Sequence, residues 1–207
     1  MEIRWLGQSA FEIKASAGTV ICDPFRALFT DDGPLKDPNT VVTFSRRDSA
    51  LRGLPEEVKS LTGPGEYEIS GLSIRGVATP AGDPQSSRDI NTVFIVDADG
   101  VNVGVLGVPG IQPDAQAMQL VGQVDVLLVT SENGALSADD LSSVVRSFEP
   151  KVIVPSGYDP DAGAPGPELA ALLTELGAKA GDPQTRLSLT RSNLPEEVTT
   201  VILQLRS

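Results

Sequence analysis

Short apolar stretches dominate the first half of the chain and predict β-strands. Residues 11–15 alternate apolar and polar side chains with the two-residue period of a half-buried strand. Residues 19–22 and 40–44 are continuous apolar runs, which are typical of strands buried on both faces. A further strand is expected to begin at residues 3–6, so this half of the chain predicts sheet structure rather than helix.

Two dipeptides of turn residues separate paired apolar runs and predict hairpins. One hairpin is expected over residues 67–77 with its turn at Ser70-Gly71, and another over residues 92–106 with its turn at Asp99-Gly100. Residues 24–39 contain three prolines and predict a loop.

Two other stretches of this half predict a short helix and a loop. Residues 54–58 have a proline and two acids where a short helix would begin. Residues 80–91 are a polar loop.

The second half of the chain alternates predicted strands and helices. Helices are expected at 113–121, at 137–148 with Ser137 as N-cap, and at 168–176 before Gly177. Strands are expected at 124–130, 152–154, 185–190 and 199–205. Residues 156–167 hold three prolines and three glycines and predict an irregular surface loop, either a lid or a solvated insertion.

This order of elements indicates α/β layers built around mixed sheets. With 207 residues the chain is long enough for one sizeable core, and we expect a single domain over residues 1–207.

The charge of the chain excludes several kinds of partner. There are 16 basic and 28 acidic residues, which gives a net charge of −12 and argues against nucleic acid or an anionic membrane as partners. No secretory signal and no long apolar run is present, so a cytoplasmic location is expected. A homo-oligomer, most simply a dimer, is the default expectation.

The residue types that the chain lacks exclude several kinds of chemistry. There is no histidine and only one cysteine, Cys22. A Ser-His-Asp triad, a Cys-His pair, a histidine-ligated metal and a multi-cysteine zinc site are therefore excluded.

Several short motifs occur in an order that resembles a known family. They are Trp5-Leu6-Gly7, Ile21-Cys22-Asp23-Pro24, Gly63-Pro64-Gly65-Glu66-Tyr67-Glu68, Gly76-Val77-Ala78-Thr79, Asn91-Thr92-Val93-Phe94, Glu149-Pro150-Lys151-Val152 and Leu194-Pro195-Glu196-Glu197. The chain resembles the metallo-β-lactamase superfamily, in its small branch of predicted zinc-dependent hydrolases. The resemblance implies an α/β fold, a four-layer αββα sandwich of two mixed β-sheets.

The same resemblance shows that the metal-binding motif of this family is degraded. The family's Thr-His-x-His-x-Asp-His motif corresponds to residues 43–49, where Thr43 and Asp48 are kept. The six other ligand positions of the family have lost their metal-ligating side chain. The residues at the former metal-motif positions are Phe44, Arg46, Asp48, Ser49, Ala81, Val108 and Gly157.

The chemistry of these replacements argues against zinc. A catalytic zinc ion needs about three protein ligands with nitrogen, sulfur or carboxylate donors. Phenylalanine, alanine, valine and glycine side chains offer none, and Arg46 brings a fixed positive charge to the place of the dication. We therefore expect no metal and no cofactor.

The resemblance gathers a set of polar residues around the former metal mouth. The candidate ligand-binding residues are Gln8, Asp23, Ser45, Arg46, Arg47, Asp48, Arg88 and Tyr158. Arginine side chains could form forked hydrogen bonds with a small anionic ligand. In the structural alternative, Arg46 pairs with Asp48 or Asp23 and Arg47 is a solvated surface charge.

The leading hypothesis is a metal-free pseudoenzyme that binds a small anion or acts as an interaction module. One alternative is a hydrolase in the former metal cleft that works without metal or with a carboxylate-bound metal. Another is a structural protein whose cleft is filled by Phe44, Val108 and the 156–167 loop. Whether the chain is an enzyme stays open at this point.

Overall fold

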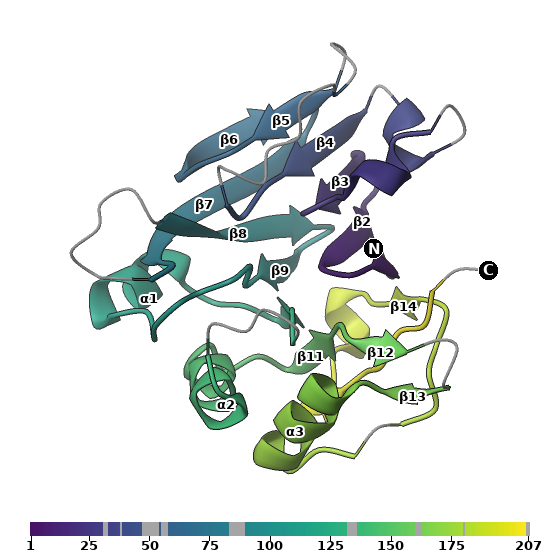
Figure 1. Ribbon diagram of the computed structural model, residues 1–207. Helices are drawn as coiled ribbons and strands as arrows, with labels where there is room; N and C mark the ends of the chain where they lie inside the picture. The colour runs from purple at the N-terminus through teal and green to yellow at the C-terminus, as the bar shows by residue number, and fades with distance from the viewer. Residues whose placement is uncertain are drawn as a thin grey trace.

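Two packed β-sheets with flanking helices form the body of the protein. The computed structural model, drawn in Figure 1, describes residues 1–30, 33–37, 39–46, 54, 58–82, 90–131, 136–159, 163–179 and 181–205. The expected sandwich of two mixed sheets is confirmed, because each sheet combines parallel and antiparallel strand pairs.

The first sheet, sheet A, is built mainly from the N-terminal part of the chain. Its six strands lie in the order β14 (Leu187–Ser188), β1 (Glu2–Gly7), β2 (Ala10–Lys14), β3 (Thr19–Cys22), β4 (Thr40–Thr43) and β5 (Lys59–Leu61).

The second sheet, sheet B, takes up the middle and the end of the chain. Its seven strands lie in the order β15 (Thr199–Thr200), β11 (Val152–Pro155), β10 (Val126–Val129), β9 (Val101–Val105), β8 (Ile90–Ala98), β7 (Leu72–Pro80) and β6 (Gly65–Ile69).

The inner faces of the two sheets share one core. Ile3, Trp5 and Phe11 from sheet A belong to the same buried cluster as Phe94 and Val103 from sheet B. Strand β1 alternates half-buried and buried positions, because only one of its faces meets this core. Burial of these large apolar side chains is the main stabilisation of the sandwich.

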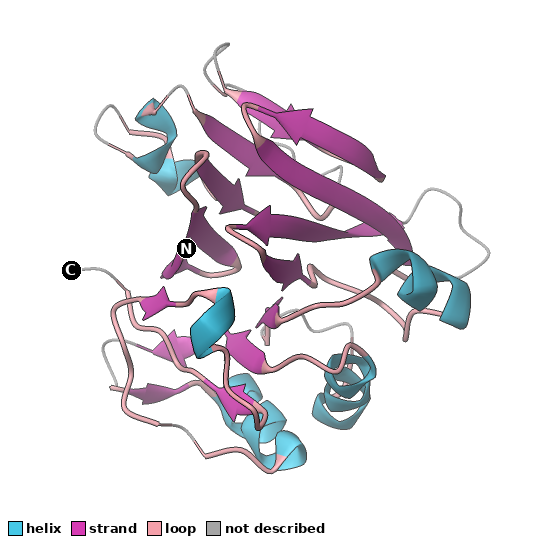
Figure 2. Cartoon of the chain, turned by 180° about the vertical axis from the view of Figure 1, so that it is seen from behind, coloured by secondary structure: helices cyan, strands magenta, loops and turns pink. Residues whose placement is uncertain are grey.

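The outer faces of the two sheets are covered differently. Helices α1 (Ala115–Val121), α2 (Ala138–Ser147) and α3 (Pro167–Leu176) pack on sheet B, and they lie together on one side of the molecule in Figures 1 and 2. On the outer face of sheet A, Ile21, Val42 and Phe44 pack against Leu35 and Phe29. Strands β3 and β4 are therefore buried on both faces, as their continuous apolar runs predicted.

The local signals for turns and caps are confirmed. Ser70-Gly71 and Asp99-Gly100 form the two hairpin turns, each with two consecutive positive φ angles, of 53° and 82° and of 58° and 78°. Such a pair is typical of the type I′ turn, which matches the twist of the strands. Ser137 caps α2 by accepting from the amide of Asp140, and α3 ends at Gly177 in the left-handed region.

Four expectations about the bounds or structure of individual segments need correction. Residues 24–39 are not loop throughout, because they contain the 3₁₀ turns η1 (Arg26–Leu28) and η2 (Pro34–Lys36). The 156–167 loop contains a small ribbon of β12 (Tyr158–Asp159) and β13 (Ala164–Pro165). Strand β11 includes Pro155, one residue beyond the expected strand at 152–154.

The fourth correction concerns the closing strands, which are much shorter than 185–190 and 199–205. Strands β14 and β15 have two residues each and join different sheets, and the 3₁₀ turn η4 (Arg191–Asn193) lies between them. Of the short helix expected at 54–58, residues 55–57 lie outside the described residues. No helix in the described part of the chain is long and apolar enough to cross a membrane.

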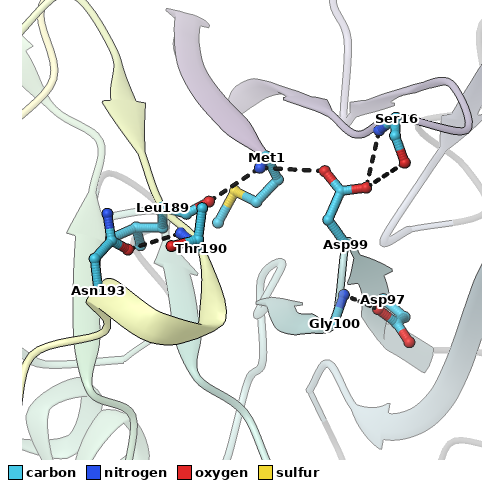
Figure 3. A network of polar contacts seen from close by, with 8 residues as sticks. All are labelled: Met1, Ser16, Asp97, Asp99, Gly100, Leu189, Thr190 and Asn193. Atoms are coloured by element: carbon cyan, nitrogen blue, oxygen red, sulfur yellow. Dashed lines mark hydrogen bonds and ion pairs between the residues drawn. The ribbon is translucent and has the colours of Figure 1, made fainter.

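A polar network ties the two sheets together at the Asp99 turn (Figure 3). The Asp99 carboxylate accepts hydrogen bonds from the amide of Ser16 at 3.0 Å and from its hydroxyl at 2.5 Å. The amino group of Met1 lies 3.2 Å from the same carboxylate and donates to the carbonyl of Leu189. The hydrogen bonds from Ser16, and then the Met1 amine, hold the pKa of Asp99 below its usual 3.8.

This lowered pKa predicts a pH-dependent contribution to stability. Asp99→Asn should lower the free energy of unfolding by about 0.5–1 kcal/mol near neutral pH, because a partly exposed charge-assisted contact is lost. The difference from the natural chain should shrink as the pH falls below 3.8, where the carboxyl of the unfolded chain takes up its proton. Urea unfolding at several pH values measures this difference.

Asp182→Asn is the matched control for this measurement, because Asp182 is exposed and its side chain forms no hydrogen bond within the described residues. A difference for Asp99→Asn that does not change with pH, or an equal loss in the control variant, would contradict the prediction.

Candidate functional site

The candidate site lies where the chain passes from sheet A to sheet B. Immediately after β4, the amide of Phe44 still donates to the carbonyl of Leu61 in sheet A, at 2.9 Å. The carbonyl of the next residue, Ser45, accepts from the amide of Thr92 in sheet B at 2.7 Å, and Arg46 forms an antiparallel bridge with Asn91. Residues 44–46 therefore join the edges of both sheets.

The register of sheet B explains why this crossing can occur. Strand β9 pairs with β8 only as far as the pair Phe94 and Val105. At Thr92, two residues before that pair, the backbone of β8 bonds to Ser45 instead, and β7 continues on its other side. Backbone groups at this edge are thus satisfied by the segment that carries the candidate residues.

Asp23 fixes the start of this segment from the end of β3. One carboxylate oxygen of Asp23 accepts from the amide of Ser45 at 2.6 Å, and the other accepts from the Ser45 hydroxyl at 2.7 Å. Asp23 has a φ of 45°, which an L-residue adopts only at some energetic cost. The two hydrogen bonds to Ser45 offset that cost and hold the carboxylate at the mouth of the site.

The buried amide of Asn91 fixes the other side of the segment. Its nitrogen donates to the hydroxyl of Thr79 at 2.9 Å and to the carbonyl of Leu106 at 3.0 Å, and its oxygen accepts from the amide of Val108 at 2.8 Å. One fully buried side chain thus joins β7, β8 and the loop after β9.

The close packing around Asn91 also explains Gly107. This residue has a φ of 68°, and a Cβ there would collide with the side-chain oxygen of Asn91 and lie 2.7 Å from the hydroxyl of Ser45. Only glycine satisfies both the backbone angle and the close approach.

An open cleft of about 310 Å³ borders these residues. Its lining combines two arginines, two serines, one carboxylate and three apolar side chains. These lining residues are Ser9, Asp23, Pro24, Phe25, Arg26, Ser45, Arg46 and Val108. The cleft therefore has a cationic and hydroxyl-bearing part together with an apolar part.

Burial changes the acid–base behaviour of two neighbouring groups. Burial raises the pKa of Asp23 from 3.8 to about 6, although the hydrogen bonds from Ser45 act in the opposite direction. Burial and the nearby charge of Asp23 raise the pKa of the Cys22 thiol, so Cys22 stays a neutral thiol and a small core residue.

The structure brings together only part of the residue set that the sequence suggested. Asp23, Ser45, Arg46 and Val108 line one cleft. Gln8 is exposed, and it is the next residue, Ser9, that lines the cleft. Tyr158 lies in β12, packs against two core clusters and does not line the cleft.

The other former metal-motif positions that the structure describes are structural. Phe44 and Ala81 are buried, and Phe44 belongs to the cluster on the outer face of sheet A. Gly157 is buried with a φ of 102°, and its carbonyl accepts from the amide of Gly166. Arg47, Asp48, Ser49 and Arg88 lie outside the described residues.

Four residues of the candidate site were missed at the sequence level. Ser9, Phe25 and Arg26 line the cleft but lie in segments without hydrophobic periodicity, so no pattern marked them. Asn91 belongs to one of the motifs that carry the family resemblance, but its structural role was not predicted. The available signal was a polar residue among apolar strand positions, which indicates a buried side chain that forms hydrogen bonds.

The donor chemistry of the cleft does not fit a zinc ion. Asp23 is the single carboxylate among the described lining residues, and both of its oxygens accept from Ser45. Two arginines border the same space, and the chain has no histidine. Among the described residues, no three thiol or carboxyl groups lie close enough together to hold a metal.

Comparison with known proteins relates the chain to one superfamily. A family model described as "Beta-lactamase superfamily domain" matches residues 2–156. A proposed Zn-dependent hydrolase of the metallo-beta-lactamase superfamily from Thermotoga maritima is 22% identical, with 99% of each chain covered and a TM-score of 0.73. No curated protein matches the sequence.

Two more solved structures share the fold at lower identity. A metallo hydrolase from Ignicoccus hospitalis is 16% identical, with 91% of this chain and 99% of that chain covered and a TM-score of 0.58. A proposed metal-dependent hydrolase from Parabacteroides distasonis is 14% identical, with 99% and 93% covered and a TM-score of 0.60.

The Asn91 network predicts a large loss of stability on truncation. Asn91→Ala should lower the free energy of unfolding by about 2–4 kcal/mol, because it leaves the buried carbonyl of Leu106 and the amide of Val108 without that partner. Chemical unfolding measures the loss. Asn102→Ala is the control, since the side chain of Asn102 forms no hydrogen bond within the described residues. A loss for Asn91→Ala no larger than that of the control would refute this role.

The raised pKa of Asp23 gives a second prediction. Ser45→Ala should raise this pKa further above about 6, because it removes a hydroxyl that favours the ionised carboxylate. Carboxyl-carbon NMR titration measures the shift, with the cleft variant Ser9→Ala as the control that leaves it unchanged. An unchanged or lowered pKa in Ser45→Ala would count against the assigned hydrogen bond.

The raised pKa of Asp23 also makes the free energy of unfolding of the natural chain depend on pH. The folded protein binds the carboxyl proton of Asp23 more tightly than the unfolded chain does, so the stabilisation from this proton is fully present below pH 3.8. It is lost as the pH rises through about 6.

Proposed function

The chain belongs to the beta-lactamase superfamily, and on that premise we propose that it is a metal-free member whose cleft binds a small anion. The observation that carries the proposal is the lining of the cleft, to which Arg26, Arg46 and Ser9 all contribute. Guanidinium groups form charge-assisted hydrogen bonds with carboxylate and phosphate groups, and they repel a dication.

The relatives in structure are described as metal-dependent hydrolases, and this activity does not transfer to the chain on chemical grounds. Activation of water by zinc needs an ion held by suitable donors. The described cleft offers one engaged carboxylate and two cations in their place. The fold is thus kept while the support for that chemistry is absent from the described lining.

The openness of the cleft favours binding over a purely structural role. A structural protein was expected to fill this space with Phe44, Val108 and the 156–167 loop. Phe44 instead packs on the outer face of sheet A, and no described residue of the 156–167 loop lines the cleft. Val108 forms one wall and leaves about 310 Å³ open.

The first experiment measures metal content and anion binding on the same untagged protein. After exposure to zinc, manganese and magnesium, we expect less than about a tenth of a metal ion per chain, because genuine structural zinc sites fill stoichiometrically. Calorimetry with acetate, benzoate and inorganic phosphate should then detect saturable binding of at least one anion. The tag must be absent because its histidines would supply the ligands that the chain lacks.

Variants of the arginines locate the binding. Arg46→Gln and Arg26→Gln should each lower the affinity for the anion at least about fivefold, which is the loss expected when a charge-assisted hydrogen bond is removed. Arg191→Gln is the control, since Arg191 lies at η4 and donates to the carbonyl of Gly100. Near one metal ion per chain, or no anion binding that depends on Arg46 and Arg26, would overturn the proposed function. In the metal-bound outcome, hydrolase assays would follow.

A further inference from the structure

A second open cavity, of about 470 Å³, lies between the ends of α1 and α2 and is called the helix-end groove below. Its lining comes from the last turns of the two helices and from the segments that lead into β10 and β11. The lining residues are Met118, Gln119, Gly122, Gln123, Val124, Asp125, Ser147, Phe148, Glu149 and Lys151. None of them lines the cleft of the candidate site, and the volume lies within the range of small-ligand sites.

The helix-end groove and the cleft lie at opposite ends of the parallel strands of sheet B. Val108, which lines the cleft, follows β9, whereas Asp125 and Lys151 come directly before β10 and β11. These three strands run parallel to one another. A ligand in the groove would therefore be independent of a ligand in the cleft.

Hydrogen bonds and packing hold the base of the groove in place. The carbonyl of Asp125 accepts from the amides of Lys151 and Val152, both at 3.0 Å. The hydroxyl of Ser147 lies 3.9 Å from the sulfur of Met118, so the ends of α1 and α2 are in direct contact. The side chains of the groove therefore extend from a fixed framework.

The carboxylate of Asp125 is a buried charge that lines the groove. Asp125 is 1% exposed, and its two oxygens accept from the backbone amide of Asn102 at 2.9 Å and from the side-chain amide of Gln123 at 3.0 Å. Both donors are neutral, and Asp125 forms no ion pair with any other described residue. Because burial of an unpaired charge is costly, a positively charged group of a ligand would gain free energy beside it.

The rim of the groove carries one charge of each sign. Glu149 and Lys151 are exposed, and neither side chain forms a hydrogen bond or an ion pair within the described part of the chain. Only Pro150 separates them, so their Cα atoms are at most about 7 Å apart. A small ligand with neighbouring positive and negative groups could therefore contact both side chains at once.

The remaining part of the lining is apolar. Val124 and Phe148 are buried in the core beneath the helices, and the half-buried Met118 packs against the same cluster. An apolar group that contacts these side chains gains free energy by leaving water. The net charge of −12 does not repel a ligand whose own charges balance.

We propose that the helix-end groove binds a zwitterionic α-amino acid with an apolar side chain. Its ammonium group lies beside Asp125 and Glu149, its carboxylate lies beside Lys151, and its side chain contacts the apolar lining. Such a ligand carries its two charged groups on one carbon atom, as the short spacing of Glu149 and Lys151 requires. This site does not depend on the proposed function of the cleft.

Calorimetry on the full, untagged chain tests this assignment with leucine, glycine and leucinamide. Leucine is expected to bind saturably, and at least about fivefold more tightly than either comparison compound. Glycine keeps both charges and lacks the apolar side chain. Leucinamide keeps the ammonium group and the side chain and lacks the carboxylate.

Variants of the rim separate the two charges of the ligand. Lys151→Gln should lower the affinity for leucine about three- to fivefold and leave that for leucinamide unchanged, whereas Glu149→Gln should lower both. Lys179→Gln and Glu196→Gln are the matched controls, because both residues are exposed and neither lines the groove. Arg26→Gln, in the cleft, should leave leucine binding unchanged.

Each contrary outcome overturns a defined part of the proposal. Absence of saturable leucine binding, or an equal loss in the control variants, would refute the site itself. Leucinamide binding as tightly as leucine would show a site for cations rather than zwitterions, and glycine binding as tightly would exclude the apolar contact. Leucine binding that is lost in Arg26→Gln would place the amino acid in the cleft and overturn the groove as its site, while the proposed function would stand.

Discussion

The buried amide of Asn91 is the interaction on which the geometry of the cleft depends. It makes three hydrogen bonds, with Thr79, Leu106 and Val108, from a fully buried position. An unpaired polar group at that depth would cost more free energy than a typical hydrogen bond contributes, so all three partners are held in place. The backbone of Asn91 also bridges to Arg46, and this places the arginine at the mouth of the cleft.

This network is one of several sets of hydrogen bonds that hold the residues around the cleft in place. The end of β3 is fixed to residue 45 by the two hydrogen bonds of Asp23, and the loop after β9 is fixed by Asn91. Gly107 has no Cβ, so the side chains of Asn91 and Ser45 can both lie close to its backbone. Each of these contacts joins two groups of the protein, so hydrogen bonds and close packing within the chain support the framework of the cleft.

The sequence predicted the elements whose signals are local. The apolar runs of β3 and β4, the turn at Asp99-Gly100 and the capping residue Ser137 each have a physical cause within a few residues. The two-residue strands β14 and β15 could not be predicted in the same way, because partners far along the chain define them.

The same distinction holds for the site. Asp23, Ser45 and Arg46 were found because they follow strands in a recognisable motif. Phe25 and Arg26 come from a 3₁₀ turn and the residue before it, and only the packing of the chain brings them to the cleft. Tyr158 was expected there from its place after Gly157, but it packs against two core clusters and does not line the cleft.

The acidic character of the whole chain and the cationic part of the cleft act over different ranges. At physiological ionic strength, charges more than about 8 Å apart in solvent are largely screened, so most of the net charge of −12 acts only weakly on a group in the cleft. Under the proposed function, a bound anion would lie beside two guanidinium groups at short range, where attraction is less screened. The local lining of the cleft, rather than the charge of the whole chain, would then decide whether an anion binds.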